Sequence, residues 1–424
     1  MKSLHKIILF ALLPLMGACS GMLDIEPHSA VSPTVVGSDD IEALRIGMYN
    51  KVQEGPTYYS YIAFDLFGGE LMTSTGRPID LINSLSNALH TFVSSQWNGY
   101  YKALLQVNNV MSIAEGLADS PTRNRVLGEC RYFRAYIYLC LVTRFGDVPV
   151  LRQNTQAKDP ASMAWELVEE DLDAASGFLN GLSADSFYYV SPAAVTALKA
   201  RVKLYLGKKG EAKELAESLI ANPNYALDDF DKIFRSKANK EVIFAFSCLT
   251  EDGSSIKISN QFYSYNHPNK GSYNYRPAGD VMTMYADNDL RKEVSITTLD
   301  NLNFVNKYPS GQTGSDPVVI SRLAEMYLIS AEAQGLNGGL DRLNELREKR
   351  GLDRVSPGNE ADFLDAVLQE RRLEFLAEGF RWYDLVRTGK ATQTLGTKDY
   401  QCLMPLPSRE LLYNPNLKPN NPGY

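Results

Sequence analysis

The sequence predicts an all-α protein, in which a tetratricopeptide-like helical-repeat scaffold carries long irregular loop insertions. Apolar residues recur at helical spacing from about residue 97 to 221 and again from about 318 to 388. Within each range, two helices with small residues at their contact positions follow one another across a short turn, which indicates helical repeats. The segments at about 57–96 and 228–317 are rich in Asn, Ser, Gly and Tyr, which favours loops.

The chain begins with a pattern typical of a secretory signal. A cationic start precedes an apolar run of nine residues, Ile7 to Leu15, whereas a helix needs roughly 20 residues to span a bilayer. The small residues before Cys19 make this segment similar to a bacterial lipoprotein signal, in which the cysteine becomes the lipidated first residue. We therefore assign residues 1–18 to a lipoprotein signal peptide, lipidation to Cys19 and the folded domain to residues 19–424. An ordinary secretory signal with an incidental cysteine is the alternative.

Three helices open the scaffold and the first repeat-like pair follows them. The apolar periodicity predicts these helices at about 97–117, 124–143, 163–179, 191–207 and 210–221. Ser191 followed by Pro192 is a good start for the fourth helix, because serine caps helices and proline fits their first position. Gly207 makes the short turn to the fifth helix, and Ala200 and Ala212 let the two helices approach closely.

A second pair is predicted at about 318–336 and 339–350, with small residues at Ala331, Ala333 and Gly335. One last helix is predicted at about 361–387. In the insertions we expect a short strand at 241–247, and loop at 57–76 and over most of 228–317. Because binding sites favour long ordered loops on a rigid base, we expect the insertions to face a ligand.

Tyrosine is the distinctive feature of the composition, with 24 residues against 17 Phe and 3 Trp. Two aromatic clusters fall in the insertions, at residues 57–67 and 262–275. A tyrosine ring offers a flat apolar face and a hydroxyl group, which suits a sugar or an extended peptide. The alternative is that these rings pin the loops to the core, and a core role is favoured for Trp97. The predicted ligand-binding residues are Tyr58, Tyr59, Tyr61, Trp97, Tyr263, Tyr265, Asn266, Tyr273 and Tyr275.

The sequence disfavours several classes of function. A net charge of −7 without a basic block argues against nucleic acid, and four His residues leave little for a metal site. No phosphate-binding glycine loop or nucleophile motif is present, so we predict no enzyme activity, no catalytic residue, no metal and no cofactor. The cysteines after Cys19 have neither disulfide-like nor metal-like spacing, and we expect small core residues at Cys130, Cys140, Cys248 and Cys402.

Three glutamates with a spacing of four residues could suggest catalysis. Glu370, Glu374 and Glu378 fall on one face of the last predicted helix. A glycosidase needs two carboxyl groups on opposite sides of a sugar, whereas neighbours on one helix face flank nothing. We therefore expect an ion-paired structural face, whose cations are supplied by the nearby Arg371, Arg372 and Arg381.

Several motifs together match one family. They are Trp97 with Asn108, Arg134-Ala-Tyr136, Arg144-Phe-Gly-Asp147-Val-Pro149, Glu325-Met-Tyr-Leu-Ile-Ser-Ala-Glu-Ala333, Glu370-Arg-Arg-Leu-Glu-Phe375, Glu378-Gly379-Phe-Arg381-Trp382-Tyr-Asp384, Met404-Pro405-Leu-Pro407 and Asn421-Pro-Gly-Tyr424. With Leu23-Asp24 and Pro27 after Cys19, they make the chain resemble the SusD/RagB family of outer-membrane nutrient-binding lipoproteins. These motifs belong to the scaffold, so they do not identify a ligand.

The resemblance implies a SusD-like fold and an N-terminal lipid that holds the protein at the outer membrane, facing the cell surface. It also implies a partner, a SusC-like TonB-dependent transporter over which the lipoprotein sits as a hinged lid. We therefore expect a protein that binds a nutrient, most often an oligosaccharide, and delivers it to that transporter. The alternatives are a peptide-binding lid of the same type, a lipid-anchored glycan hydrolase, and a repeat scaffold that binds only proteins.

Overall fold

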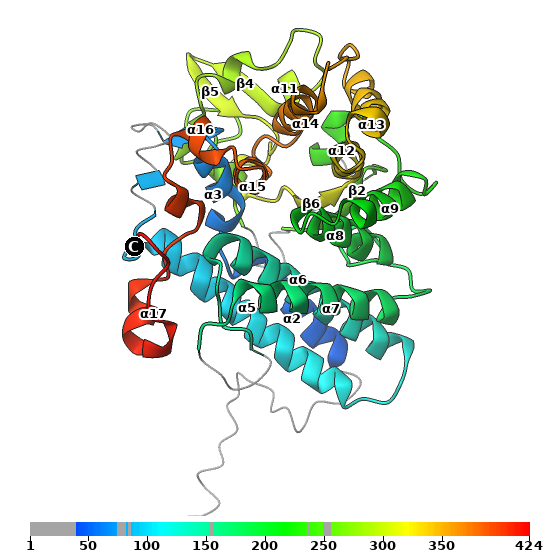
Figure 1. Ribbon diagram of the computed structural model, residues 1–424, viewed down its shortest axis with the longest axis vertical. Coiled ribbons are helices and arrows are strands. Elements are labelled where there is room, and N and C mark those ends of the chain that lie inside the picture. Colours follow the sequence, from blue (N-terminus) through cyan, green and yellow to red (C-terminus); the bar gives the residue numbers. More distant parts are fainter. Residues whose placement is uncertain (1–39, 74–81, 84–85, 152–156, 236–237, 249–255) are drawn as a thin grey trace, which may run out of the picture.

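The computed structural model describes residues 40–73, 82–83, 86–151, 157–235, 238–248 and 256–424. The predicted signal peptide and the lipidation site Cys19 lie outside the described residues. In the described part of the chain, helices form most of the structure and the strands form three two-stranded sheets (Figure 1). None of the helices in this part is long and apolar enough to cross a membrane.

Helices packed side by side form the lower part of Figure 1. They are α2 (Ile41–Glu54), α5 (Thr91–Glu115), α6 (Pro121–Phe145) and α7 (Ala161–Phe178). The Ser120 hydroxyl begins α6 by accepting the Arg123 N–H at 3.1 Å, and Gly146 ends it with a φ of 71°. The three helices predicted between residues 97 and 179 are thus confirmed, although α5 begins earlier than expected.

Two helix pairs form the repeat-like part of the scaffold. They are α8 (Pro192–Tyr205) with α9 (Lys209–Ile220), and α12 (Leu323–Gln334) with α13 (Leu336–Lys349). The pairs stack on each other, because α12 packs against α9 as well as against α13. Ser191 caps α8 as predicted, since its hydroxyl accepts the Ala194 N–H at 3.1 Å. This stacking confirms the predicted all-α, tetratricopeptide-like fold.

The segment between the two pairs folds as short elements connected by loops. Its strand β2 (Val242–Phe246) confirms the predicted strand and pairs antiparallel with β6 (Val318–Arg322). A hairpin is formed by β4 (Ile296–Leu299) and β5 (Leu302–Val305). The remaining elements are α10 (Phe230–Arg235), β3 (Tyr275–Pro277), α11 (Lys292–Ser295) and 3-10 turns at Ser259–Gln261, Val281–Thr283 and Gly311–Thr313.

The expectation of loop at 57–76 was wrong for most of that segment. Helix α3 (Tyr59–Phe67) occupies its first half, and β1 (Leu71–Thr73) follows and pairs with β3. All residues of α3 from Ser60 onward are buried, so the helix has no polar face. A helix that is covered all round carries no amphipathic period, and the periodicity of the sequence therefore could not predict it.

Two predicted helices also differ in their limits. Residues 318–322 form β6 instead of the start of α12, because their β-branched side chains are buried where they pair with β2. The helix predicted at 361–387 is in fact two helices, α14 (Glu360–Glu374) and α15 (Arg381–Arg387). Between them Ala377 and Gly379 have φ values of 61° and 81°, which a right-handed helix cannot contain.

The C-terminal segment returns to the end of α6. It contains α16 (Ala391–Leu395), α17 (Ser408–Tyr413) and 3-10 turns at Asp399–Cys402 and Pro415–Leu417. The Asn421 side-chain amide donates to the Phe145 carbonyl at 2.7 Å, which fixes the chain end to the scaffold. As expected, the described cysteines are free, and three of them are buried: Cys130, Cys140 and Cys248.

Candidate functional site

The two predicted aromatic clusters are neighbours in the structure. Strand β1 follows the first cluster and β3 includes the end of the second, and the two strands pair with Leu71 opposite Pro277 and Thr73 opposite Tyr275. This pairing brings Tyr58 and Tyr59, at the start of α3, close to Tyr275. In Figure 1, α3 lies on the left of the view, below the β4–β5 hairpin.

The first group of rings contains Tyr58, Tyr59 and Tyr275. Tyr58 and Tyr59 are half-buried, and their ring centroids are 4.4 Å apart. Burial raises the pKa of Tyr275 to about 12. Burial also raises the pKa of Tyr58, and the neighbouring phenols of Tyr59 and Tyr275 add to the shift. The phenols of Tyr58 and Tyr275 are therefore protonated at neutral pH and can donate hydrogen bonds.

The second group of rings surrounds Phe304 on β5. The Tyr273, Tyr263 and His267 rings lie with their centroids 5.2, 5.9 and 4.8 Å from that of Phe304. The Tyr263 hydroxyl donates to Asn306 Oδ1 at 2.9 Å. These contacts fix the 262–275 segment to the β4–β5 hairpin, so part of this cluster has the pinning role that we considered as the alternative.

Tyr273 and Arg276 join the two groups. Tyr273 has a φ of 49°, a conformation that is unusual for a bulky residue, and its hydroxyl donates to the Asn303 carbonyl at 3.0 Å. Arg276 on β3 is half-buried, and its Nε has no hydrogen-bond partner among the described residues. The sequence prediction missed Arg276, although a cation directly after Tyr275 in an aromatic cluster was an available signal.

Several residues of these groups reach solvent, as do Tyr265 and Asn266 in the loop after Tyr263. Tyr265 is 76% exposed, Asn266 is exposed, and Tyr58, Tyr59, Tyr273 and Arg276 are half-buried. We call these six residues the tyrosine surface. It combines aromatic faces with phenol, amide and guanidinium donors, which is the chemistry that the flat faces and hydroxyl groups of a sugar require.

Three predicted ligand-binding tyrosines lie beneath the tyrosine surface. Tyr263 is fully buried, while Tyr61 and Tyr275 are each 9% exposed. The Tyr61 hydroxyl donates to the Gln53 carbonyl at 2.8 Å, in the core rather than at the surface. The Tyr263 and Tyr275 rings can support the tyrosine surface, whereas Tyr61 lines a separate cavity, and a ligand at the surface cannot stack on any of the three without a rearrangement.

Trp97 lies in another part of the molecule. Its ring is 4% exposed and packs against Tyr101 and Phe145, with centroid separations of 4.9 and 5.1 Å. It lines the floor of a groove of about 320 Å³ between α5 and the C-terminal segment, which also contains Lys102 and Glu410. The structure therefore does not bring Trp97 together with the predicted tyrosines.

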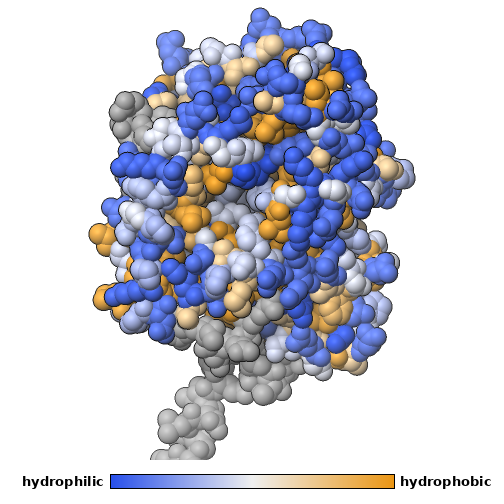
Figure 2. Space-filling model, viewed as in Figure 1, coloured by the Kyte–Doolittle hydropathy of each residue, from blue (hydrophilic) through white to orange (hydrophobic). Residues whose placement is uncertain are grey.

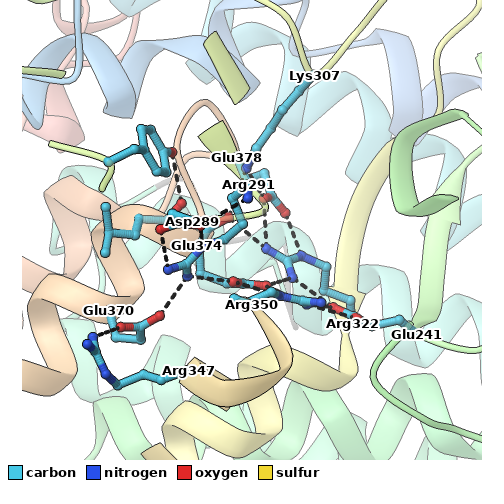
Figure 3. A network of polar contacts seen from close by, with 12 residues as sticks. Glu241, Asp289, Arg291, Lys307, Arg322, Arg347, Arg350, Glu370, Glu374 and Glu378 are labelled. Carbon is cyan, nitrogen blue, oxygen red and sulfur yellow. Dashed lines mark hydrogen bonds and ion pairs between the residues drawn. The ribbon is translucent and has the colours of Figure 1, made fainter. Parts of the chain in front are cut away.

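The three glutamates of the last predicted helix belong to a buried ionic network (Figure 3). Glu374 accepts hydrogen bonds from Arg291, Arg322 and Arg350 at 2.9, 2.5 and 2.8 Å. Burial alone would raise the pKa of Glu374, but these guanidiniums outweigh it and hold the pKa well below its usual range. The carboxylate is thus ionised and fully buried.

The neighbouring glutamates have similar partners. Glu370 accepts from Arg291 and Arg347, each at 2.7 Å, and Glu378 accepts from Lys307 and Arg322 at 2.7 and 2.9 Å. The predicted ion pairing is thus confirmed, and Glu370 and Glu374 share a face of α14, but Glu378 lies beyond the end of that helix and the expected cations were wrong. The expected arginines pair elsewhere instead, Arg371 with Asp384 and Arg372 with Glu70.

Metal binding finds no support in the described residues. They contain no group of three or more His, Cys, Asp or Glu side chains that could hold a metal ion. His90 caps α5, where its Nδ1 accepts the Phe92 N–H at 3.0 Å, and His267 packs on Phe304. Both imidazoles therefore have structural roles.

The fold and the site together define a class of protein. It is an α-helical repeat protein whose inserted segments present aromatic side chains at the surface. Two family models match the chain, and together they cover more than half of it. The model described as "SusD family" matches residues 295–402, and the model described as "Starch-binding associating with outer membrane" matches residues 22–204. The chain belongs to the SusD/RagB family.

Relatives align with nearly the whole chain. SusD-like protein P38 of Formosa agariphila is 26% identical over 97% of both chains. Among solved structures, B. fragilis NanU has a TM-score of 0.80 at 23% identity and covers 95% of this chain and 100% of its own. A laminarin-binding SusD-like protein has a TM-score of 0.77 at 22% identity, and covers 92% of this chain and 100% of its own.

Proposed function

We propose that this protein is a cell-surface lipoprotein that binds an oligosaccharide and delivers it to a SusC-like TonB-dependent outer-membrane transporter. The observation that carries the proposal is the pairing of β1 with β3, which brings two separate tyrosine segments together and places Arg276 opposite Met72. The ligand is held on this tyrosine surface without chemical change. The lipid is attached at Cys19, outside the described residues.

The chemistry of the tyrosine surface favours a sugar. Exposed Tyr265 offers a ring face for stacking, while the half-buried Tyr58 and Arg276 offer hydrogen-bond donors. A free energy of binding shared between stacking and a few hydrogen bonds gives modest affinity, which suits a protein that must release its ligand to a transporter.

The comparisons support an oligosaccharide over a peptide. One similar structure is named as a laminarin-binding protein, and one matching family model is described as starch-binding. The hydrolase alternative has less support, because Glu370, Glu374 and Glu378 are held in buried ion pairs, and of the three only Glu378 lines a cavity, so no pair of carboxylates faces a ligand.

Calorimetric titration of the full chain in mild detergent tests the proposal, with laminarin oligosaccharides, maltooligosaccharides and a peptide pool as probes. We expect at least one glycan to bind, and the double variant Tyr58→Ala with Tyr265→Ala to weaken that binding about tenfold, or about 1.4 kcal/mol. Tyr263 is left unchanged in this variant because it is fully buried, and its replacement would leave a cavity.

Tyr413→Ala is the matched control, because Tyr413 is 68% exposed on α17, away from the tyrosine surface. It should bind the glycan as the unchanged protein does. Equal affinity in the double variant and the control would remove the tyrosine surface from the proposal. Binding of peptides alone would instead favour the peptide-binding lid.

A further inference from the structure

A cavity of about 90 Å³ lies in the middle of the molecule, separate from the tyrosine surface. Residues of α3, α6, α8, β6 and the connection between α14 and α15 line it. Figure 2 shows the molecule hollowed near the centre of this face, where these elements meet in Figure 1. Three half-buried lining residues, Thr143, Tyr205 and Tyr383, mark the side of the cavity that reaches solvent.

Arg144, which lines this cavity, is unusual among the buried arginines. Buried charges are normally paired with an opposite charge. The other buried arginines of the described chain each pair with a carboxylate, namely Arg45, Arg201, Arg291, Arg322, Arg350 and Arg371. Arg144 bonds only neutral groups in the described residues: Tyr383, Ser60 and Gln96, at 2.8 to 2.9 Å, and the Ser60 carbonyl at 3.2 Å.

The surroundings of Arg144 offset only part of the cost of burying its positive charge. Its guanidinium carbon lies 4.5 Å from the centroid of the Phe64 ring and 4.8 Å from that of Tyr100, so cation–π attraction offsets some of the cost of burial. One N–H of Nη2 is left without a partner, because Ser60 accepts only the other.

Further donors on the cavity wall also lack partners. Arg201 bonds Glu325 and the Ile320 carbonyl through Nε and Nη2, which leaves both N–H groups of Nη1 unused within the described residues. The hydroxyls of Tyr136 and Tyr205 likewise meet no hydrogen-bond partner there. Burial raises the pKa of Tyr205 to about 12, so its hydroxyl is a protonated donor at neutral pH.

We propose that this cavity binds the carboxylate of a small organic acid. Arg144 and Arg201 supply charged N–H donors, and the hydroxyls of Tyr136 and Tyr205 supply neutral ones. Val319, Ile320 and Phe380 form an apolar wall against which the carbon skeleton of the acid can pack. Glu378 also lines the cavity, but Lys307 and Arg322 already neutralise its charge, so it does not repel the incoming anion.

The test is calorimetric titration of the full chain with two acids, acetate and glucuronate, and with their neutral counterparts, acetamide and glucuronamide. Each pair differs mainly in the charge of the group that the arginines would hold. We expect at least one acid to bind in the millimolar range or tighter, and its amide to bind about tenfold more weakly or not at all. The proposal is overturned if neither acid binds at millimolar concentration, or if acid and amide bind equally.

Variants locate the site. Tyr136→Phe and Tyr205→Phe each remove one unpartnered hydroxyl without removing the ring, and each should weaken binding of the acid about tenfold, as expected for a hydrogen bond to a charged group. Tyr132→Phe is the matched control, since Tyr132 is buried one turn away on α6 but does not line the cavity. Phenylalanine variants are preferred to a change at Arg144, which also holds Ser60 and Gln96 in place.

The outcomes also separate this site from the proposed oligosaccharide site. The Tyr265→Ala variant should bind the acid normally, because Tyr265 lies on the tyrosine surface and not in the cavity. A loss of acid binding in Tyr265→Ala, or an equal loss in Tyr132→Phe and Tyr136→Phe, would show that the cavity is not the site.

Discussion

Glu374 shows at the scale of one residue how this fold keeps charges in its core. Its carboxylate is fully buried, and three guanidiniums bond it at 2.5 to 2.9 Å. Two arginines come from segments before α12, and Arg350 comes from the end of α13. The network is therefore stable only when distant parts of the chain have reached their final positions.

Replacement of this carboxylate by an amide should destabilise the protein strongly. Glu374→Gln keeps the shape of the side chain but removes the negative charge that balances the buried cations of Arg291, Arg322 and Arg350. Breaking a buried ion pair in this way typically costs about 3–5 kcal/mol. Urea unfolding followed by circular dichroism should show that loss in the free energy of unfolding.

Asp365→Asn provides the matched control on the same helix. Asp365 bonds Lys390 at 2.8 Å, but its side chain is 60% exposed, so water screens the pair. The free energy of unfolding should change by less than about 1 kcal/mol. Similar losses in the two variants would contradict the view that burial gives the network its importance.

The sequence could predict that these glutamates are ion-paired, but not with which cations. Spacing along α14 is local information, and it correctly indicated a shared face for Glu370 and Glu374. The actual partners Arg291 and Arg322 are far away in the chain, and no local sequence pattern identifies them. The same limit applies to Arg144, whose lack of a carboxylate partner appears only when the whole fold is known.

At the scale of elements, the α12–α13 pair depends on close contact between two backbones. A Cβ atom on Gly339 would lie 2.0 Å from the Ala331 carbonyl oxygen, a distance that no unstrained structure tolerates. Ala331, one of the small residues predicted here, thus contacts Gly339, which the prediction did not name, and this contact lets α13 pack directly on α12.

We expect Gly339→Ala to destabilise the protein, because the helices must separate to admit the methyl group. Overpacking of this kind typically costs about 1–3 kcal/mol. Gly210→Ala is the control, since a Cβ atom at Gly210 would meet nothing within 4 Å. In helix α9 that change should stabilise by up to about 1 kcal/mol through helix propensity. Thermal unfolding of both variants tests the opposite signs, and a shift of the same sign would contradict the contact argument.

Elements with a clear period were predictable and elements without one were not. Helices α7 and α9 each have one apolar face, and α6 and α8 have recognisable caps, such as Ser191 before Pro192. The predicted limits of all four helices were correct within a few residues. Helix α3 is buried on all sides and has no stripe. Residues 318–320 are apolar like much of the helix that follows β6, so only the pairing with β2 distinguishes the strand.

At the scale of the whole molecule, the ionic network fixes the inserted segment to the scaffold. Arg291 and Lys307 belong to the insertion, and they bond Glu374 and Glu378, which lie on α14 and directly after it. The β4–β5 hairpin that supports the tyrosine surface lies between these two cations in the chain. The proposed ligand-binding surface is thus held on a rigid base, as a preformed site requires.

The members of the proposed site were partly predictable, but their arrangement was not. Local composition indicated both tyrosine clusters, because aromatic residues are concentrated there. Which rings are exposed depends on the pairing of β1 with β3 and on the packing around Phe304, so composition could not separate exposed Tyr265 from buried Tyr263. Whether these residues bind a ligand stays a prediction.

The many buried tyrosines predict how the stability of the whole molecule depends on pH. Burial raises the pKa of buried tyrosines such as Tyr49, Tyr61, Tyr100 and Tyr308 well above the ordinary value. In the unfolded chain each phenol loses its proton near pH 10, at about the pKa of free tyrosine. The folded state keeps those protons, so the unfolded state becomes favoured as the pH rises above that value.

Ionisation of these tyrosines should therefore leave the free energy of unfolding unchanged up to about pH 9 and lower it above about pH 10, by up to about 1.4 kcal/mol per pH unit for each such tyrosine. Lys307 changes the free energy of unfolding in the opposite direction as the pH rises, because burial lowers its pKa, but it is one group against many buried tyrosines. Urea-unfolding midpoints measured across this range, together with tyrosinate absorbance, test the prediction. Tyrosinate from the buried rings should appear only as the chain unfolds, and ionisation of every tyrosine in the folded protein at the ordinary pKa would contradict the burial of these rings.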